Sequence, residues 1–355
     1  MKYIKLGKTD LSVSRICLGT MTWGVQNNQE EAFKQMDYAL SKGVNFWDTA
    51  EAYAIPPSPD TYGTTETIIG NWLSSRKKRQ DVVLATKISP LPWARGESNP
   101  IINHENIIKA ANESLKRLQT DYIDLYQLHW VVNRPNYHFA NWWDFEPAQG
   151  FSDKEIICEN ILETLRALDQ LVKEGKIKHI GLSDDSAWGI KQFCDLSDQY
   201  NLPRIVSIQN EYNLLRRRDE TDVMETCALE DVSYLSWSPL EMGVLSGKYL
   251  NGNRPDGSRF SDKIMGDQAE RFMTRLSSMN DLAVQEYIDI AHKYNIDVCQ
   301  MAIAFTLRKN YMSCSIIGAT TMDQLKNNIS AIDLMLTDEM LSDIEKVRRK
   351  YPVPF

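Results

Sequence analysis

Eight short apolar runs, each about the length of a buried strand, alternate along this chain with segments of helical periodicity. The runs read RICLGT, NFWDTA, VVLATK, YIDLYQLH, IKHIGLSD, IVSIQN, YLSWSPL and SIIGAT. Near-continuous apolar strands that alternate with amphipathic helices indicate an α/β protein with a parallel sheet covered by helices. Because there are eight runs, the pattern favours a closed (β/α)8 TIM barrel over an open doubly wound sheet.

The segments around these runs predict the remaining elements. At the start of the chain, KYIKL, GKTD and LSVSRI have the pattern of an N-terminal β-hairpin. Helical patterns include EEAFKQMDYALSKG, HENIIKAANESLKRL, CENILETLRALDQLVKEG and DVCQMAIAFTLRKN, and extra helices are expected at the C-terminal end. The 355 residues are near the size of a barrel with insertions and contain no repeat or linker, so we expect residues 1–355 to form a single domain.

Composition and charge exclude several classes of protein. The formal net charge is −8, and a general nucleic-acid binder is not expected because phosphate contacts need a basic surface. No segment approaches the roughly 18 uncharged apolar residues that span a bilayer, and the start MKYIKLGKTD lacks the apolar run of a signal peptide. The six cysteines stand apart without a CxxC motif and are most simply buried thiols. We therefore expect a cytoplasmic protein without membrane contact, and the oligomeric state stays open.

Polar or titratable residues recur where the predicted strands end. They are Asp48, Lys87, His129, Ser183 with Asp184, Gln209 with Asn210, and Trp237 with Ser238. The C-terminal ends of the strands form the active-site face of barrel enzymes. Any one of these residues alone is most simply a solvated strand end, but their coincidence predicts one shared site.

Four residues in this region have the types that carbonyl reduction needs. Hydride delivery to a ketone or aldehyde develops an alkoxide, which requires a proton donor and nearby hydrogen-bonding or positive groups. Tyr53 could donate the proton, and a buried Lys87 ammonium beside it is expected to lower the phenol pKa from about 10 toward about 7. Asp48 would keep the lysine charged despite its burial, and His129 could orient the carbonyl.

Each of these residues also has an ordinary interpretation. Asp48 and Lys87 could be only a buried ion pair, His129 a satisfied core histidine, and either Tyr53 or Tyr62 part of the loop packing. A chemical alternative is a barrel lyase or isomerase in which Lys87 forms a Schiff base with its substrate. The combination of the four residue types favours carbonyl reduction.

Several motifs, in order along nearly the whole chain, resemble the aldo-keto reductase superfamily. They are LGTMTWG, NFWDTAEAY, LATK, SLKRLQTDYIDLYQLHW, LVKEGKIKHIGLSD, SIQNEYNLL, SWSPLEMGVLSGKY and IIGATTMDQLKNNI. The likeness is closest to bacterial Tas-like proteins and looser to the potassium-channel β-subunit branch. The resemblance implies an NADPH-dependent oxidoreductase that reduces aldehydes or ketones, with a catalytic tetrad of Asp48, Tyr53, Lys87 and His129 and no metal.

The choice of tyrosine depends on spacing. The family commonly runs its catalytic tyrosine directly into Gly-x-x-Glu, and here YGTTE begins at Tyr62. The tyrosine is also expected to follow the aspartate by five residues, as Tyr53 follows Asp48 in DTAEAY. The proline-rich AIPPSPDTYG then reads as an insertion before Glu66 and Gly70, which leaves Tyr62 a structural or substrate-wall role.

The cofactor that the resemblance implies is NADPH/NADP+, bound without a Rossmann fingerprint, since GxGxxG is absent. The resemblance assigns four residues to the nicotinamide: Ser183, Asp184, Gln209 and Trp237. It assigns Ser238, Leu240, Gly243 and Lys248 to the pyrophosphate, and Arg259, Thr320, Gln324, Asn327 and Asn328 to the adenosine. Further cofactor contacts are expected from Thr22, Trp23, Asp48, Pro239, Leu245 and Gly318. The local chemistry agrees, because residues 240–247 are a loop of small residues followed by basic ones.

Two positions depart from the family pattern. Asp184 stands where an asparagine is usual, and an ionised carboxylate cannot donate to a carboxamide oxygen. Asn327 replaces a glutamate common at the adenine end, which could alter cofactor release.

The aromatic segment 130–152 is long for a connecting loop. It could roof the substrate pocket, pack on the barrel rim or contact a protein. A further alternative for the whole chain is a redox-sensing module that binds the cofactor, reports its state to a partner and turns over only incidentally.

Overall fold

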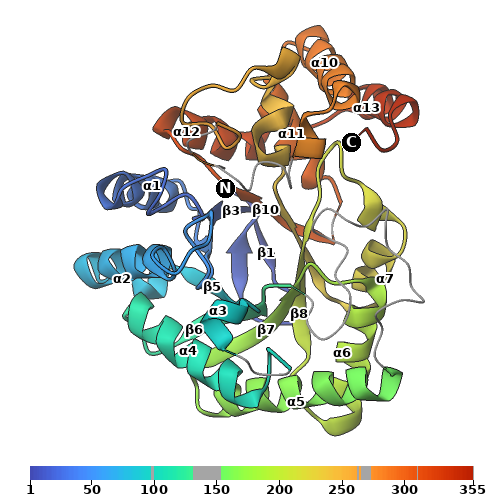
Figure 1. Cartoon of the computed structure of the whole chain (residues 1–355). Coiled ribbons are helices and arrows are strands. Elements are labelled where there is room, and N and C mark those ends of the chain that lie inside the picture. The colour runs from blue at the N-terminus through green and yellow to red at the C-terminus, as the bar shows by residue number, and fades with distance from the viewer. Residues whose placement is uncertain (97–99, 131–152, 262–263, 265–272, 310, 355) are drawn as a thin grey trace.

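The computed structural model describes residues 1–96, 100–130, 153–261, 264, 273–309 and 311–354. Its centre is a closed barrel of parallel strands in the order β10-β3-β4-β5-β6-β7-β8-β9 (Figure 1). The strands are β3 Ile16–Gly19, β4 Phe46–Asp48, β5 Val83–Ile88, β6 Ile123–Leu128, β7 Ile177–Ser183, β8 Ile205–Glu211, β9 Ser233–Trp237 and β10 Met312–Ile317. They coincide with the eight apolar runs, so the predicted (β/α)8 barrel is confirmed.

Helices surround the barrel, as Figure 1 shows. They are α1 Gln29–Ser41, α2 Thr64–Arg76, α3 Pro92–Arg95, α4 His104–Leu118, α5 Lys154–Lys173, α6 Ala187–Tyr200, α7 Val223–Glu230, α10 Ser278–Lys293, α11 Val298–Thr306, α12 Met322–Ser330 and α13 Asp338–Lys350. Local signals define their starts: the Asn28 side chain forms a capping box with Glu31 at α1, and Asn103 accepts a hydrogen bond from the Asn106 backbone at α4. The predicted C-terminal helices are therefore present.

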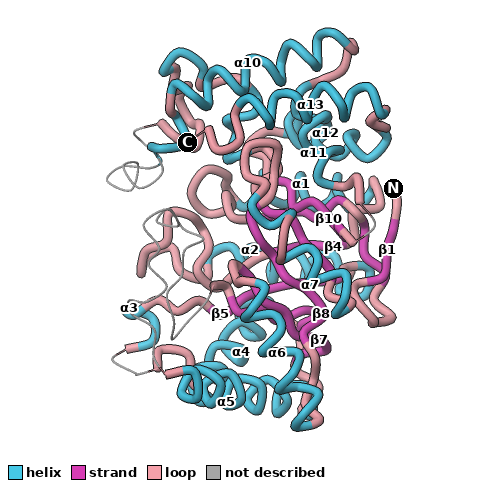
Figure 2. The backbone as a smooth tube through the Cα atoms, turned by 90° about the vertical axis from the view of Figure 1, so that its right-hand side faces the viewer, coloured by secondary structure: helices cyan, strands magenta, loops and turns pink. Residues whose placement is uncertain are grey.

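The predicted N-terminal hairpin pairs β1 Tyr3–Lys5 with β2 Ser12–Ser14 in antiparallel register. In the side view of Figure 2, β1 lies at one edge of the molecule, and α3 with several long loops lies at the opposite edge. Leu6 and Val13 of the hairpin pack against apolar residues from the barrel strands. The hairpin thus covers the amino-terminal end of the barrel and leaves the other end to the loops.

The strands supply two cores because side chains alternate between the two faces of a sheet. Trp47 packs outward in the large core beneath the helices, whereas Phe46 belongs to the small cluster inside the barrel. This double burial explains why the runs are apolar at nearly every position. Inside the barrel, the apolar residues give way to polar ones two positions further along; the pairs are Phe46 with Asp48, Ala85 with Lys87, and Leu125 with Gln127.

The described residues contain no helix long and apolar enough to cross a membrane, and no group of His, Cys, Asp or Glu side chains that could hold a metal ion. All six cysteines are free thiols. Four are buried, as the sequence predicted, and Cys158 and Cys299 are half-buried. Most of the aromatic segment 130–152 lies outside the described residues, so its role stays a prediction.

Candidate active site

A buried polar cluster lies where the interior positions of β4, β5, β6 and β8 reach their carboxyl ends. Lys87 Nζ lies 2.6 Å from Asp48 Oδ2 and donates to the Thr49 carbonyl at 2.8 Å. The other carboxylate oxygen of Asp48 accepts from Gln127 Nε2 at 3.1 Å and from Gln209 Nε2 at 2.8 Å. Both oxygens of this buried carboxylate are therefore satisfied, as burial of a charge requires.

Lys87 keeps its charge in this cluster. Complete burial alone would lower its pKa, but Asp48 and Tyr53 outweigh burial and raise the pKa above the usual value. This outcome is what the sequence predicted for the pairing of Lys87 with Asp48. A protonated ammonium is no nucleophile, so the arrangement does not favour the Schiff-base alternative.

Tyr53 lies beside this ammonium. Its hydroxyl is 3.5 Å from Lys87 Nζ, and only 9% of the residue is exposed. Burial raises the pKa of Tyr53, Lys87 opposes that shift, and Asp48 adds to it. The expected lowering of the phenol pKa is therefore not found, because burial outweighs the effect of Lys87, whose charge a carboxylate 2.6 Å away already compensates. Tyr53 consequently holds its proton at neutral pH.

His129 follows β6 and completes the group. Its ring meets the Tyr53 ring edge to face, with 5.6 Å between ring centroids. Its Nδ1 lies 2.6 Å from Ser89 Oγ. Burial lowers the His129 pKa well below its usual value and the positive charge of Lys87 lowers it further, so the imidazole is neutral. The four residues predicted as a catalytic set thus lie together at the carboxyl end of the barrel.

Tyr62 belongs to a different set of contacts. Its hydroxyl donates to Glu51 Oε2 at 2.5 Å, and its ring packs edge to face against Trp93 at 5.5 Å. Burial raises the pKa of Tyr62 to about 12. The structure therefore places Tyr53, and not Tyr62, against Lys87.

The residues predicted to hold the nicotinamide lie at the ends of β7, β8 and β9. Ser183, Asp184 and Gln209 are buried, and Trp237 Nε1 donates to Asp184 Oδ1 at 3.0 Å. Burial raises the pKa of Asp184 well above its usual value, against the effect of the Trp237 hydrogen bond. Burial thus favours the protonated carboxyl, whose hydroxyl is a hydrogen-bond donor, as the amide of the usual asparagine is.

The predicted pyrophosphate loop has an unusual backbone. Ser238, Glu241 and Met242 have positive φ values of 55°, 49° and 55°, and Gly243 follows at 96°. The amides of residues 241–243 already donate within the loop, to the Ser238 carbonyl, the Ser238 hydroxyl and the Leu240 carbonyl, so they are not free to bind an anion. A Cβ on Gly243 would fall 2.9 Å from Lys248 Nζ, so glycine is what allows the lysine to lie across the loop.

Buried charges that the sequence did not single out hold this loop in place. Glu241 is fully buried and accepts from Arg216 Nε at 2.8 Å. Arg275 pairs with Glu241 and also with Glu211, where the Arg275 NH1–Glu211 Oε1 distance is 2.6 Å. No local pattern marks these residues, because their partners come from separate parts of the chain.

At the predicted adenosine end, two assigned residues contact each other: Gln324 Oε1 accepts from the Thr320 backbone at 2.9 Å. Asn328 Nδ2 donates to the Gly318 carbonyl at 3.1 Å. Asn327 instead turns toward α11, where it bonds Gln300 and Asp297; the distances are 2.6 Å and 2.9 Å.

The remaining assigned residues have varied surroundings. Arg259 is half-buried; burial lowers the pKa of its guanidinium, and the phenols of Tyr249 and Tyr53 oppose that shift. Trp23 lies in the large core with its indole N–H on Gln35 at 3.0 Å, so its side chain does not face the site. Thr22, Pro239 and Leu245 are also buried, and Leu240 is half-buried.

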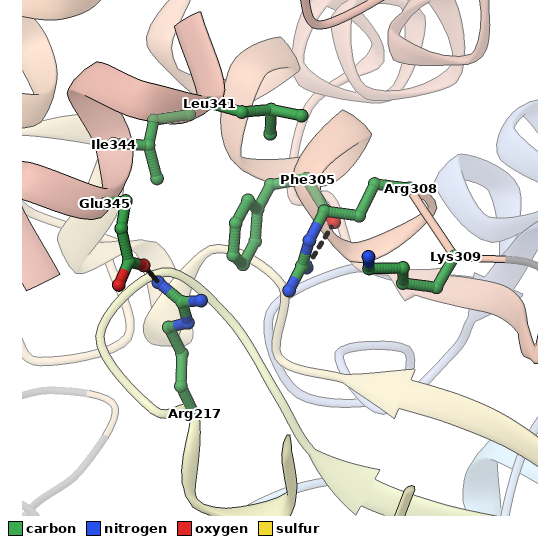
Figure 3. A pocket seen from close by; sticks show the side chains of 7 residues that line it. All are labelled: Arg217, Phe305, Arg308, Lys309, Leu341, Ile344 and Glu345. Carbon is green, nitrogen blue, oxygen red and sulfur yellow. Dashed lines mark hydrogen bonds and ion pairs between the residues drawn. The ribbon is translucent and has the colours of Figure 1, made fainter. Parts of the chain in front are cut away.

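A separate cavity of about 300 Å³ shares none of these residues (Figure 3). It is lined by Arg217, Phe305, Arg308, Lys309, Leu341, Ile344 and Glu345. Its arginines are already paired, Arg217 with Glu345 at 3.2 Å and Arg308 with Glu220 at 2.6 Å. These ion pairs join α11 and α13 to the segment after β8, which is a structural role.

Comparison with known proteins agrees with this architecture. The model of the "Aldo/keto reductase family" matches residues 15–349. The chain is 40% identical to "Protein tas" of Escherichia coli (strain K12) and to that of Shigella flexneri, over 100% of this chain and 99% of each relative. It is 32% identical to "Uncharacterized oxidoreductase YrpG" of Bacillus subtilis (strain 168), over 97% of this chain and 96% of that protein. The chain therefore belongs to the aldo/keto reductase family.

Proposed function

We propose that this oxidoreductase uses NADPH to reduce aldehydes or ketones to alcohols. The observation that carries the proposal is the contact of one buried ammonium with both a carboxylate and a phenol. Lys87 Nζ lies 2.6 Å from Asp48 and 3.5 Å from the Tyr53 hydroxyl, with the His129 ring against Tyr53. Such a group can bind a carbonyl oxygen and give it a proton.

The residues of the chain have distinct parts in this proposal. A bound nicotinamide supplies the hydride. Neutral His129 hydrogen-bonds the carbonyl oxygen, and Tyr53 transfers its proton to that oxygen as negative charge develops. Lys87 stabilises the phenolate that remains, and Asp48 keeps the ammonium protonated. The raised pKa of Tyr53 does not prevent the transfer, because an alkoxide is a stronger base than a phenolate.

The direct test is a titration of NADPH fluorescence with protein, followed by a panel of aldehydes and ketones. Binding with turnover on some carbonyls supports the proposal. Tight binding with very slow turnover and very slow cofactor release would support the redox-sensing module instead. Absence of nicotinamide binding would overturn both.

Arg259 is proposed to recognise the 2′-phosphate of NADPH. An arginine holds a phosphate through two parallel charge-assisted hydrogen bonds, each worth about 1.5–3 kcal/mol before solvent exposure reduces it. Arg259 makes no ion pair with a described residue, so its guanidinium is not committed to a carboxylate. Arg259→Ala should weaken NADPH binding by roughly one to two orders of magnitude and change NADH binding little.

The measurement compares dissociation constants of both cofactors at one stated salt concentration. Arg254→Ala is the matched control, since Arg254 lies in the same loop and is exposed. Equal losses for NADPH and NADH on removal of Arg259 would show that it does not read the phosphate. A larger NADPH-specific loss in Arg254→Ala would transfer the role to that residue.

The pKa directions predict the pH dependence. Tyr53 must be protonated to donate, so activity is present below its raised pKa and lost only above it. His129 is neutral above its lowered pKa, so it adds no inflection near neutrality. Single-turnover reduction at saturating NADPH should therefore be nearly constant from about pH 6 to about pH 9. A rate that declines from about pH 7 upward would show that the phenol is acidified in the loaded enzyme.

A further inference from the structure

Ser89, just past the end of β5, joins His129 to a second buried network. Its side chain is fully buried, and its Oγ lies 2.6 Å from His129 Nδ1. No sequence pattern singles out this serine, which stands in the segment KISP. The contact is across strands, from the residue after β5 to the residue after β6.

The direction of this hydrogen bond follows from the available partners. Among the described residues, His129 Nδ1 is the sole hydrogen-bond partner of Ser89 Oγ. If Nδ1 carried the proton, the serine hydrogen would be buried without an acceptor, at a cost of about 1–3 kcal/mol. If Ser89 donates to Nδ1, both groups are satisfied. The second arrangement leaves the proton of the neutral imidazole on Nε2.

The backbone of Ser89 is held on both sides by one buried ion pair. Its N–H donates to Glu51 Oε1 at 2.6 Å, and its carbonyl accepts from Arg95 Nε at 3.2 Å. Arg95 is itself paired with Glu51, and Tyr62 donates to the other Glu51 oxygen at 2.5 Å. We refer to Glu51, Arg95 and Tyr62 as the Ser89 clamp.

The ion pair of this clamp is buried, so it is held more rigidly than an ion pair on the surface. Glu51 is fully buried and Arg95 is 6% exposed, so neither can exchange its partner for water. The clamp also accounts for Tyr62: its hydroxyl completes the hydrogen bonds of the Glu51 carboxylate. Tyr62, the first residue of YGTTE, therefore contacts Glu51 and reaches Ser89 only through it.

We propose that Ser89, held by the Glu51, Arg95 and Tyr62 clamp, is a positioning residue that fixes His129 as the Nε2–H tautomer. The nitrogen left for the substrate is then a donor, which is the form that binds a carbonyl oxygen. The catalytic consequence rests on the proposed carbonyl reduction. The tautomer itself does not, and it can be measured without any substrate.

The first experiment is long-range proton–nitrogen NMR of the full chain labelled with ¹⁵N-histidine. The sequence has five histidines, and the spectrum of His129→Gln identifies the His129 signals by their loss. Wild type should show an unprotonated Nδ1 and a protonated Nε2. Ser89→Ala should give mixed or reversed tautomers, and Ser89→Thr, which keeps the hydroxyl, should restore the wild-type pattern. A proton on Nδ1 in wild type, or an unchanged pattern in Ser89→Ala, would overturn the proposal.

The second experiment measures catalysis and separates position from stability. Ser89→Ala should lower kcat/KM by about tenfold to a hundredfold with the NADPH dissociation constant unchanged. In a His129→Gln background the same change should cost less than about twofold, because Ser89 acts through the histidine. Ser197→Ala is the matched control: Ser197 is 1% exposed and donates to the Phe193 carbonyl at 2.7 Å within α6.

The two experiments distinguish failure of the proposed function from failure of the proposed role of Ser89. If wild type reduces no carbonyl, the proposed function is wrong and the NMR result still decides the tautomer. If Ser89→Ala costs as much in the His129→Gln background as in wild type, the serine does not act through His129. If Ser197→Ala lowers kcat/KM as much as Ser89→Ala does, the loss reflects general destabilisation, and the positioning role is rejected.

Discussion

Tyr53→Phe should abolish ketone reduction while cofactor affinity stays nearly intact. The substitution keeps the ring that packs edge to face on His129 and removes only the hydroxyl beside Lys87 Nζ. With the hydroxyl gone, no proton is available at the position where the alkoxide develops. A loss of at least two orders of magnitude in the single-turnover rate is expected, within the range for a general acid.

Tyr62→Phe is the matched control for this prediction. It removes a hydroxyl that donates to Glu51 and lies outside the Lys87 cluster. Glu51 keeps its bonds to Ser89 and Arg95, so activity should change only mildly. If Tyr62→Phe were inactive and Tyr53→Phe active, the assignment of the proton donor would be wrong.

Lys87→Met should lower the reduction rate by about two to four orders of magnitude. Methionine keeps the length of the side chain but removes the ammonium that stabilises the Tyr53 phenolate. It also leaves the Asp48 carboxylate buried without its cation, which costs about 3–5 kcal/mol of folding stability. Rate and stability therefore have to be measured together, by single-turnover kinetics and by urea unfolding.

The double variant Asp48→Asn with Lys87→Met separates these two effects. It removes the buried charge as well as its partner, so folding stability should largely recover while activity does not. Gln127 and Gln209 can still bond the asparagine oxygen. If Lys87→Met kept most of its activity, the proton-transfer scheme would be wrong. If borohydride trapped a substrate on wild-type Lys87, the lyase or isomerase alternative would replace it.

The barrel was predictable because its cause is local and repeated. Each strand is buried on both faces and must be apolar, while each helix is buried on one face and shows helical periodicity. Helix α4 has the bounds of HENIIKAANESLKRL, since an asparagine cap precedes it and Gln119 follows in the left-handed conformation. The carboxyl ends of the strands then had to meet, which is why Asp48, Lys87 and His129 could be grouped from the sequence.

The hydrogen-bond and ion-pair partners that other elements contribute to the site could not be predicted from the sequence. Gln127 lies two positions before His129, and its bond to Asp48 follows only from the barrel, which brings β6 and β4 together. Ser89 contacts His129 across two strands, and Arg275 reaches Glu211 from far along the chain. Side-chain contacts of this kind depend on the register of the sheet and on loop paths.

The sequence by itself determined the barrel and the residue types at its carboxyl end, and its resemblance to the family, through the five-residue spacing, implied the preference for Tyr53 over Tyr62. The tertiary structure decided the electrostatics. Lys87 keeps its charge as predicted, but it does not lower the Tyr53 pKa, because burial outweighs an ammonium that Asp48 already compensates. Desolvation depends on which atoms exclude water from a group, and charge compensation depends on the distance between the charged atoms. Neither can be read from the sequence, because both depend on the folded structure.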